Sequence, residues 1–285
     1  MSPKEYRPSL ALEYLRVLSI AGSDSGGGAG IQADIKTFAA LGCYGMTAIT
    51  ALTAQNTLGV RSIHGISPQM LRDQIDTVLE DIGAHAAKIG MLHSPEIVLT
   101  VAEAIDRHRL EKVVLDPVMV ATSGAVLIDN SAISVLVREL FPRSLLVTPN
   151  LDEASLLVGR PLRSEGEMEA AAREMLGMGA NAVLLKGGHL PGDLVCDLLL
   201  IKGGDAHWMR AARIDTSNTH GTGCTLSSAI AAYLASGTTL RQSVESARAY
   251  VRAALKASVA VRTGSGSGPL NHGFSPLSMQ LRPLP

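Results

Sequence analysis

The apolar positions of this chain follow two alternating patterns, and together they predict an α/β fold. Short runs of consecutive apolar residues are typical of strands that are buried on both faces. Between these runs, apolar residues recur every three or four positions, which is typical of amphipathic helices. The strand-like runs cover 17–21, 46–52, 86–89, 113–116, 145–148 and 182–186, and the helical segments cover 31–41, 71–82, 95–108, 131–141 and 167–178. This alternation predicts a parallel sheet covered by helices on both faces.

The C-terminal part of the chain departs from this alternation. Two apolar segments, 194–201 and 207–212, are separated by Lys-Gly-Gly-Asp-Ala, which predicts an antiparallel hairpin. Two long helices are predicted after it, over 224–235 and 240–261. The tail 263–285 is rich in Gly, Ser and Pro, and we expect it to be loop with partial order.

Length and composition then limit the number of domains and the class of partner. No repeat or long linker divides the 285 residues, so we expect residues 1–285 to form one domain with an N-terminal extension over 1–15. The 25 Lys and Arg balance 26 Asp and Glu, and only 3% of residues are aromatic, so neither nucleic acid nor a membrane surface is an expected partner. The uncharged stretches 37–60 and 216–240 contain many polar residues and predict buried core, not membrane spans.

Three cysteines, Cys43, Cys196 and Cys224, are too widely spaced for a disulfide framework or a Cys-x-x-Cys metal site. The first 16 residues contain charges and no continuous apolar run, so they do not resemble a secretory signal. Both observations favour a reducing compartment, and we expect a cytoplasmic protein.

A first glycine cluster matches the dinucleotide-binding pattern G-x-G-x-x-A over 28–33. That mechanism also needs an acidic residue about 20 positions further on, and none occurs between Asp34 and Asp73. A Walker A phosphate loop is excluded because the chain contains no Gly-Lys pair. We therefore interpret this cluster as a turn between a strand and a helix, with neither of these nucleotide-binding motifs.

A second glycine cluster, Asn218–Thr225, directly precedes a predicted helix. Its glycines let successive backbone N–H groups point at one place, and the helix N-terminus adds partial positive charge, so the segment predicts an anion site. Cys224 lies in the first turn, where the helix dipole is expected to lower the pKa of its thiol. An activated sulfur beside an anion favours catalysis, although a loop with a small buried cysteine has the same pattern.

Polar residues also follow three of the predicted strands. Asn150 and Glu153 come after 145–148, where they suit Mg²⁺ or, more commonly, a helix capping box. Asp116 ends another strand, where it either supports a bound metal ion from the second coordination shell or simply terminates the strand. Lys186 ends a third strand before Gly-Gly, and its ammonium either meets a phosphate or is solvated.

Six phrases of the sequence, in this order, resemble a known family. They are 17–24 with 25–34, Lys88–Leu92, Leu115–Met119, Thr148–Asn150, Leu185–His189 and Asn218–Thr225. With them, the chain from about Val17 to His272 resembles the hydroxymethylpyrimidine/phosphomethylpyrimidine kinases of thiamine biosynthesis, in the ribokinase superfamily. The match is specific and covers nearly the whole chain.

The resemblance implies a ribokinase-like three-layer α/β/α sandwich with a mostly parallel central sheet and an antiparallel hairpin. It implies an enzyme that uses ATP and Mg²⁺ to phosphorylate 4-amino-5-hydroxymethyl-2-methylpyrimidine and then its monophosphate, at one site. It also implies a homodimer.

The same resemblance assigns roles to individual residues. The pyrimidine pocket would be lined by Gly22, Asp34, Gln55, Met91, Val118 and Cys224, with Gln55 as a hydrogen-bond partner of the ring. The loop Gly221–Cys224, with Gly223 inside it and Thr222 on the nucleotide, would hold the transferring phosphoryl group. Asn150 and Glu153 would organise Mg²⁺ and its waters, with Asp116 acting through water, and Lys186 and Asn150 would approach the nucleotide phosphates.

Two positions depart from the family pattern. Most ribokinase relatives have an aspartate general base where this chain has Cys224, so a thiolate would have to act as the base here. The first phosphorylation removes a hydroxyl proton and the second does not, so we expect Cys224→Ala to slow the first step more. Ser25 stands where many members have proline, which predicts a more flexible glycine loop.

Two other functions remain open at this point. A pyridoxal or pyridoxine kinase of the same superfamily would share the fold and the predicted anion site at Asn218–Thr225. A non-catalytic sensor of a vitamin precursor would share the fold alone, and the joint presence of Asn150, Glu153 and Cys224 argues against it.

Overall fold

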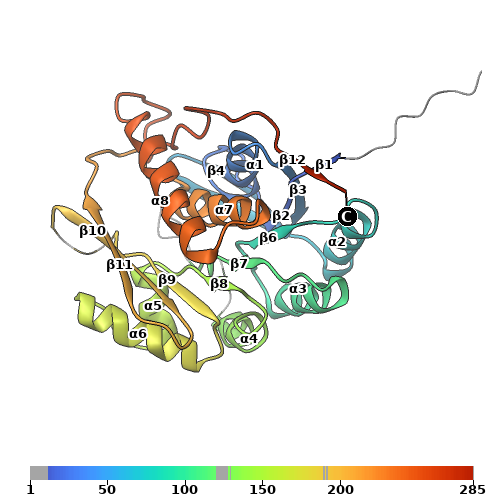
Figure 1. The fold of residues 1–285 in the computed structure, drawn as a ribbon, viewed down its shortest axis with the longest axis horizontal. Helices are drawn as coiled ribbons and strands as arrows, with labels where there is room; N and C mark the ends of the chain where they lie inside the picture. The colour runs from blue at the N-terminus through green and yellow to red at the C-terminus, as the bar shows by residue number, and fades with distance from the viewer. Residues whose placement is uncertain (1–11, 120–127, 129, 189, 191, 285) are drawn as a thin grey trace, which may run out of the picture.

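The computed structural model describes residues 12–119, 128, 130–188, 190 and 192–284. Its centre is an eight-stranded sheet in the order β11-β10-β9-β8-β7-β6-β2-β3 (Figure 1). The strands are β2 (Arg16–Ala21), β3 (Tyr44–Ile49), β6 (Ala86–Ile89), β7 (Val113–Leu115), β8 (Leu146–Val147), β9 (Ala182–Leu185), β10 (Leu194–Ile201) and β11 (His207–Ala212). Neighbours from β3 to β9 are parallel, and β10 pairs antiparallel with both β9 and β11. The predicted mostly parallel sheet and the antiparallel hairpin are confirmed.

Helices cover both faces of this sheet, which makes the predicted three layers (Figure 1). One face packs against α1 (Gly30–Ala40), α7 (Thr222–Ala235) and α8 (Leu240–Lys256); the other packs against α2 (Pro68–Asp81), α3 (Pro95–His108), α4 (Asn130–Leu140), α5 (Leu151–Val158) and α6 (Glu165–Gly177). Because side chains alternate along a strand, Val183 joins the core of α2–α6 while Leu184 joins the core of α1, α7 and α8. The central strands are therefore mostly apolar on both faces, as the sequence pattern indicated, with Lys88 in β6 a buried exception.

The segment 46–52, predicted as one strand, is divided at Thr50. Beyond this residue the chain leaves the main sheet as β4 (Ala51–Asn56), which pairs antiparallel with β5 (Gly59–Gly65). The Thr50 hydroxyl fixes the turn by donating to the Met91 carbonyl oxygen at 2.7 Å. Strand β5 was missed because none of its residues is buried, so it lacks the apolar pattern of a core strand.

Among the helices, α5 and α8 depart most from the predictions. Helix α5 was not predicted as an element because its 8 residues are too few to show a helical period. Helix α8 ends at Lys256, and residues 257–260 form turns where the prediction continued the helix to 261.

The two ends of the described chain meet in a separate two-stranded sheet. Strand β1 (Leu12–Tyr14), in the N-terminal extension, pairs antiparallel with β12 (Leu281–Pro283), in the C-terminal tail (Figure 1). The tail also packs against the end of α1, where Gln280 N donates to Gly42 O at 2.8 Å. The predicted loop-rich tail therefore contains one strand, and residues 1–11 of the extension lie outside the described residues.

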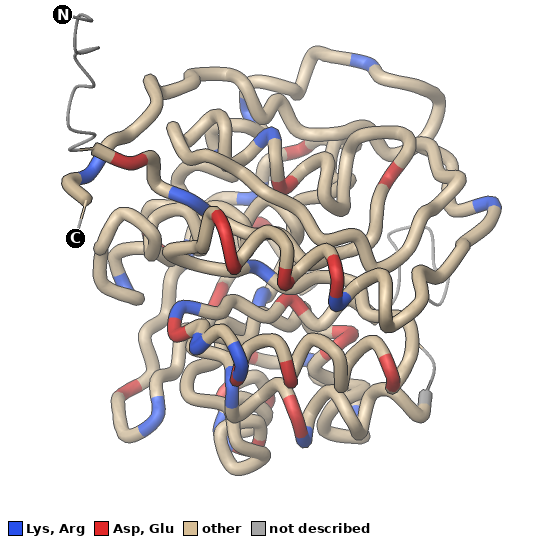
Figure 2. Tube along the Cα trace, turned by 90° about the vertical axis from the view of Figure 1, so that its right-hand side faces the viewer, with Lys and Arg blue, Asp and Glu red and all other residues tan. Residues whose placement is uncertain are grey.

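Charges of both signs are interspersed along the described trace (Figure 2). No helix among the described residues is long and apolar enough to cross a membrane.

Candidate active site

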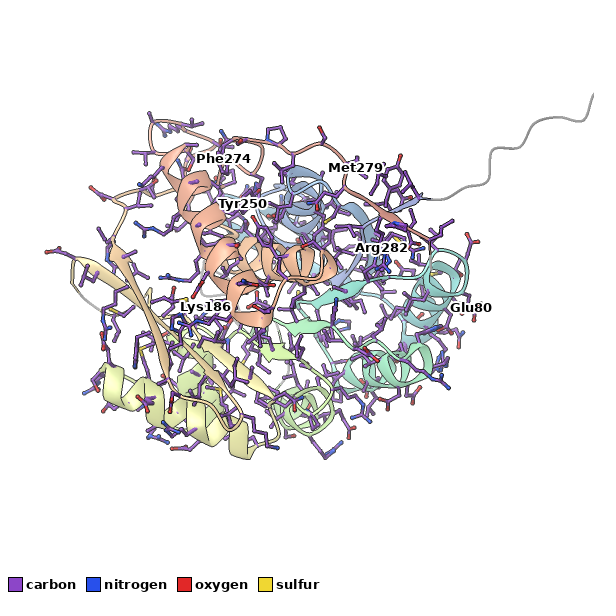
Figure 3. All side chains as sticks on the ribbon, viewed as in Figure 1. Glu80, Lys186, Tyr250, Phe274, Met279 and Arg282 are labelled. Atoms are coloured by element: carbon purple, nitrogen blue, oxygen red, sulfur yellow. The ribbon has the colours of Figure 1, made fainter. Side chains whose placement is uncertain are left out.

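A cavity of about 830 Å³ opens where the parallel strands end. The carboxyl ends of parallel strands lie at one edge of the sheet, so residues that follow different strands meet there. Gly22 follows β2, Met91 follows β6, Asp116 follows β7, Asn150 follows β8 and Lys186 follows β9, and all five line the cavity. Helix α7 points its N-terminus at the same space, and Figure 3 labels Lys186 on this side of the fold.

The second glycine cluster forms the middle of the cavity wall. Gly221 is the residue before α7 and has a φ of 83°, a left-handed conformation that suits glycine. The Thr225 amide and hydroxyl both donate to Gly221 O at 2.8 Å and hold the first turn in place. A methyl group on Gly223 would lie 3.3 Å from Lys186 Nζ, so the N-terminus of α7 faces a lysine ammonium across the site.

Lys186 and Asp116 form an ion pair in this wall. Lys186 Nζ lies 2.9 Å from Asp116 Oδ1, which also accepts a hydrogen bond from the Thr148 hydroxyl. Burial alone would raise the pKa of Asp116, but Lys186 and Lys88 outweigh it and hold that pKa below its usual value. Both groups are therefore charged, and a phosphate entering the site meets a fixed cation.

Asn150 and Glu153 form the capping box of α5. Asn150 Oδ1 accepts from Glu153 N at 2.9 Å, and Glu153 Oε2 accepts from Asn150 N at 2.8 Å. The capping interpretation is thus confirmed, and both residues also line the cavity. Burial raises the pKa of Glu153 to about 7, although Lys186 opposes the shift.

Cys224 does not have the lowered pKa expected from its place in the first turn. Burial raises the pKa of its thiol to about 11, and the nearby carboxylates of Asp34 and Asp116 add to the effect of burial, while Lys88 opposes it. The helix dipole is outweighed because the protein packed around the half-buried sulfur, together with the two nearby carboxylates, disfavours the charged thiolate. The expectation of a thiolate at neutral pH is wrong for the unliganded protein.

Asp34, expected in the pyrimidine pocket, lies one layer behind the cavity wall. Its carboxylate is fully buried and pairs with Lys88 Nζ at 2.9 Å, while the Ser19 and Ser228 hydroxyls donate to it at 2.6 and 2.7 Å. Lys88 lines the cavity and Asp34 does not. The expectation that Asp34 lines the pocket is therefore wrong: its carboxylate supports Lys88, which does line the cavity. Sequence reasoning assigned no role to Lys88, and its place inside an apolar strand was the available signal.

The other residues expected around a pyrimidine do line one end of the cavity. They are Gly22, Gln55, Met91, Val118 and Cys224. A methyl group on Gly22 would lie 3.0 Å from Met91 Sδ, so the end of the methionine side chain would have to shift to admit it. Ser25, expected to loosen the glycine loop, instead ties it to β4: its hydroxyl donates to Gln55 O and accepts from Gln55 N, both at 2.8 Å.

The opposite end of the cavity was missed by sequence reasoning. It lies between the β10–β11 hairpin, the segment that follows β11, and α8; its lining includes Val195, Arg213, Ile214, Thr216, Val251, Arg252 and Leu255. These residues come from separate elements and form no local motif. The sequence indicated this end only indirectly, because a hairpin and a long helix were predicted beside the edge of the sheet.

Comparisons with known proteins now define the class. The family model described as phosphomethylpyrimidine kinase matches residues 24–271. The structure of the pyridoxal kinase from Staphylococcus aureus, in complex with AMP-PCP and pyridoxal, has a TM-score of 0.84 and 33% identity, and covers 95% of this chain and 100% of that one. Fold and site therefore define a small-molecule kinase with a ribokinase-like fold.

Curated relatives narrow the class further. The hydroxymethylpyrimidine/phosphomethylpyrimidine kinase of Rhizobium meliloti is 49% identical over 90% of this chain and 96% of its own length. The thiamine biosynthesis bifunctional protein ThiED of Geobacter sulfurreducens is 51% identical over 90% of this chain, which spans about half, 52%, of that protein. The chain belongs to the phosphomethylpyrimidine kinase family, and the resemblance drawn from its motifs is confirmed.

Proposed function

We propose that this chain transfers the γ-phosphoryl group of ATP to the hydroxymethyl group of 4-amino-5-hydroxymethyl-2-methylpyrimidine, and then phosphorylates the monophosphate to the diphosphate. The observation that supports this most is that one cavity is lined both by Gly22, Met91 and Val118 and by the N-terminus of α7, whose N–H groups suit an anion. A phosphoryl donor and a small acceptor could bind on opposite sides of that helix end, in line for transfer.

The acceptor would bind between Gly22, Met91 and Val118. The close approach of Gly22 to Met91 makes this end narrow, which suits a small flat ring. The Gln55 carboxamide can both donate and accept, as an aminopyrimidine edge requires. Its backbone is held by Ser25, so its position is fixed before substrate arrives.

The donor would place its base against Val251, Ile214 and Leu255 at the opposite end. Its terminal phosphate would then meet backbone N–H groups of Gly221–Cys224, with Thr222 among them, and the Lys186 ammonium. These groups would neutralise charge that spreads over the equatorial oxygens during transfer. Alignment and charge neutralisation would supply most of the rate enhancement.

The donor set beside this loop fits Mg²⁺. Asp116 and Glu153 are buried carboxylates that line the cavity, and Mg²⁺ usually takes one or two protein carboxylates together with waters and phosphate oxygens. They would hold the ion through water, with Asn150 orienting Glu153 through the capping box. When bound, Mg²⁺ supplies positive charge to the phosphates.

Cys224 would accept the hydroxymethyl proton in the first phosphorylation. Its raised pKa makes the thiolate rare but strongly basic, and phosphoryl transfer requires little help from a base. The second step attacks with a phosphate oxygen that is already anionic, so it would not depend on the sulfur.

A pyridoxal kinase remains the second candidate, because the solved pyridoxal kinase has the same fold at 33% identity. The 49% identity to a hydroxymethylpyrimidine/phosphomethylpyrimidine kinase favours the aminopyrimidine. A coupled assay of ADP release with each heterocycle, ATP and Mg²⁺ tests the choice. Faster turnover of hydroxymethylpyrimidine is expected; faster turnover of pyridoxal, or no turnover of either, would contradict the proposal.

We also propose a homodimer and a single domain over residues 1–285. Among the described residues, the β4–β5 hairpin stands outside the main sheet and exposes Leu52, Leu58 and Ile63, an apolar surface suited to a second copy. Light scattering should give twice the mass of the chain, and a Leu58→Glu variant should lower it; a monomeric mass for the parent protein would contradict the dimer.

A further inference from the structure

We propose that His220 is a positioning residue for phosphoryl transfer: held by Asp24, its imidazole fixes the anion loop against the first glycine loop. The inference rests on the proposed kinase function and adds two residues to which neither motif analysis nor that function gave a role. Residues 22–30 form the first glycine loop, and residues 218–224 form the anion loop.

Asp24 organises the first glycine loop from inside. Its carboxylate is almost fully buried, and it accepts hydrogen bonds from the backbone N–H groups of Gly26, Gly28 and Ala29 at 2.8–3.0 Å. Burial would raise the pKa of Asp24, but His220 and these N–H groups hold it below its usual value. The carboxylate is therefore ionised and can only accept hydrogen bonds.

His220 brings the anion loop to this carboxylate. Its Nε2 lies 2.8 Å from Asp24 Oδ2, and because the carboxylate is an acceptor, Nε2 must be the donor. The backbone of His220 is fixed on the other side, where its N–H donates to Gly268 O at 3.0 Å. His220 is thus held on one side by its imidazole, which bonds to Asp24, and on the other by its backbone, which bonds to Gly268, with 8% of the residue exposed.

The two loops fit together with no space to spare. A methyl group on Gly28 would lie 2.4 Å from His220 Cδ2, and one on Gly221 would lie 1.8 Å from Gly28 O. A shift of either loop therefore moves the other, and the first lines the acceptor end while the second faces the phosphate.

Reaction geometry explains why this coupling matters. Transfer requires the acceptor oxygen and the phosphorus to be aligned at close range, and misplacement by about 1 Å can cost about 10²-fold in rate. The hydrogen bond from His220 to Asp24 lies between the parts that hold these two atoms. Its loss should disturb their alignment while leaving each binding surface present.

The test compares His220→Ala with His220→Gln, whose side-chain nitrogen can reach the position of Nε2. Steady-state kinetics of each phosphorylation should show kcat reduced about 10²-fold in His220→Ala, with KM for ATP and for the pyrimidine within about threefold of the parent. His220→Gln should recover kcat to within about fivefold. His108→Gln is the matched control: His108 pairs with Asp76 at 2.7 Å on the opposite face of the sheet, and kcat should not change.

Unchanged kcat in His220→Ala, or a loss confined to KM, would overturn the positioning role. If His220→Ala cannot be purified folded, His220→Leu, which fills part of the same space but cannot donate, Asp24→Asn and their double variant take its place. Non-additive losses of kcat in that cycle support the coupling, and additive losses overturn it. A parent protein that releases no ADP would contradict the proposed function, whereas an active parent with an equally active His220→Ala contradicts only this inference.

Discussion

Around the anion loop, the part of the cavity called the transfer end below, Lys88 is buried, Lys186 is largely buried and both are paired with carboxylates, whereas at the nucleotide end Arg213 is exposed. Lys88 and Asp34 are fully buried together, and Lys186 faces Asp116 beside the helix N-terminus. Arg213, by contrast, is exposed and donates to three backbone carbonyls, those of Gly188, Leu190 and Gly192.

The difference shows how one cavity can combine fixed chemistry with an adaptable grip. Buried pairs and backbone contacts do not rearrange easily, so they suit the atoms that react. Apolar side chains and long arginine side chains can adjust their conformations slightly. They therefore suit the part of the nucleotide that is bound but does not react. Changes at the transfer end should therefore lower kcat, and changes at the nucleotide end or the acceptor end should raise KM for the molecule bound there.

The largest effect is expected from Gly221→Ala. The new methyl group would meet Gly28 O at 1.8 Å, and φ at this position is 83°, so the anion loop must move. We expect kcat to fall about 10³-fold or more by coupled assay. Gly237→Ala, beyond the other end of α7, is the control: its φ is 90° but no atom lies within 4 Å, so it should lower thermal stability and leave kcat unchanged. Equal kcat in both variants would contradict a fixed transfer end.

A pH profile of the two phosphorylations tests the sulfur. Because burial raises the pKa of Cys224 to about 11, its thiolate fraction increases about tenfold for each pH unit between 7 and 10. The first phosphorylation should therefore quicken with pH more than the second. Cys224→Ala should lose about 10–10²-fold in the first step, much less in the second, and the extra pH dependence should disappear. Equal losses in both steps would refute the role of base.

Ile214→Ala tests the nucleotide end. Removing apolar contact should raise KM for ATP about three- to tenfold and leave kcat within about twofold. Met91→Ala, at the opposite end, should raise KM for the pyrimidine instead. Were Ile214→Ala to reduce kcat as strongly as a transfer-end variant, the contrast between the ends would be lost.

The smallest effect is expected from Ser25→Ala. It removes two hydrogen bonds to the Gln55 backbone, so KM for the pyrimidine should rise about two- to fivefold at constant KM for ATP. An unchanged KM for the pyrimidine would show that Gln55 is held by β4 alone.

The sequence predicted most of the fold because its core strands are continuous apolar runs whose boundaries are marked by glycine and proline. It did not predict β5, whose residues are exposed, or the pairing of β12 with β1, which depends on segments far apart in the chain. These elements are defined by tertiary contact, not by local pattern.

The same distinction applies to the site. The anion loop, Asp116, Asn150 and Lys186 were found because each follows a strand or precedes a helix. The predicted lowering of the pKa of Cys224 was wrong, because this pKa depends on burial and on Asp34 and Asp116, which no local motif reveals. The pairing of His220 with Asp24 joins residues 196 positions apart.

The most direct test of the central claim is a crystal structure with a non-hydrolysable ATP analogue and Mg²⁺. We expect its terminal phosphate oxygens to accept hydrogen bonds from the backbone N–H groups of Gly221–Cys224, with the adenine against Val251 and Ile214. A terminal phosphate bound elsewhere, with the N-terminus of α7 facing only water, would contradict the account.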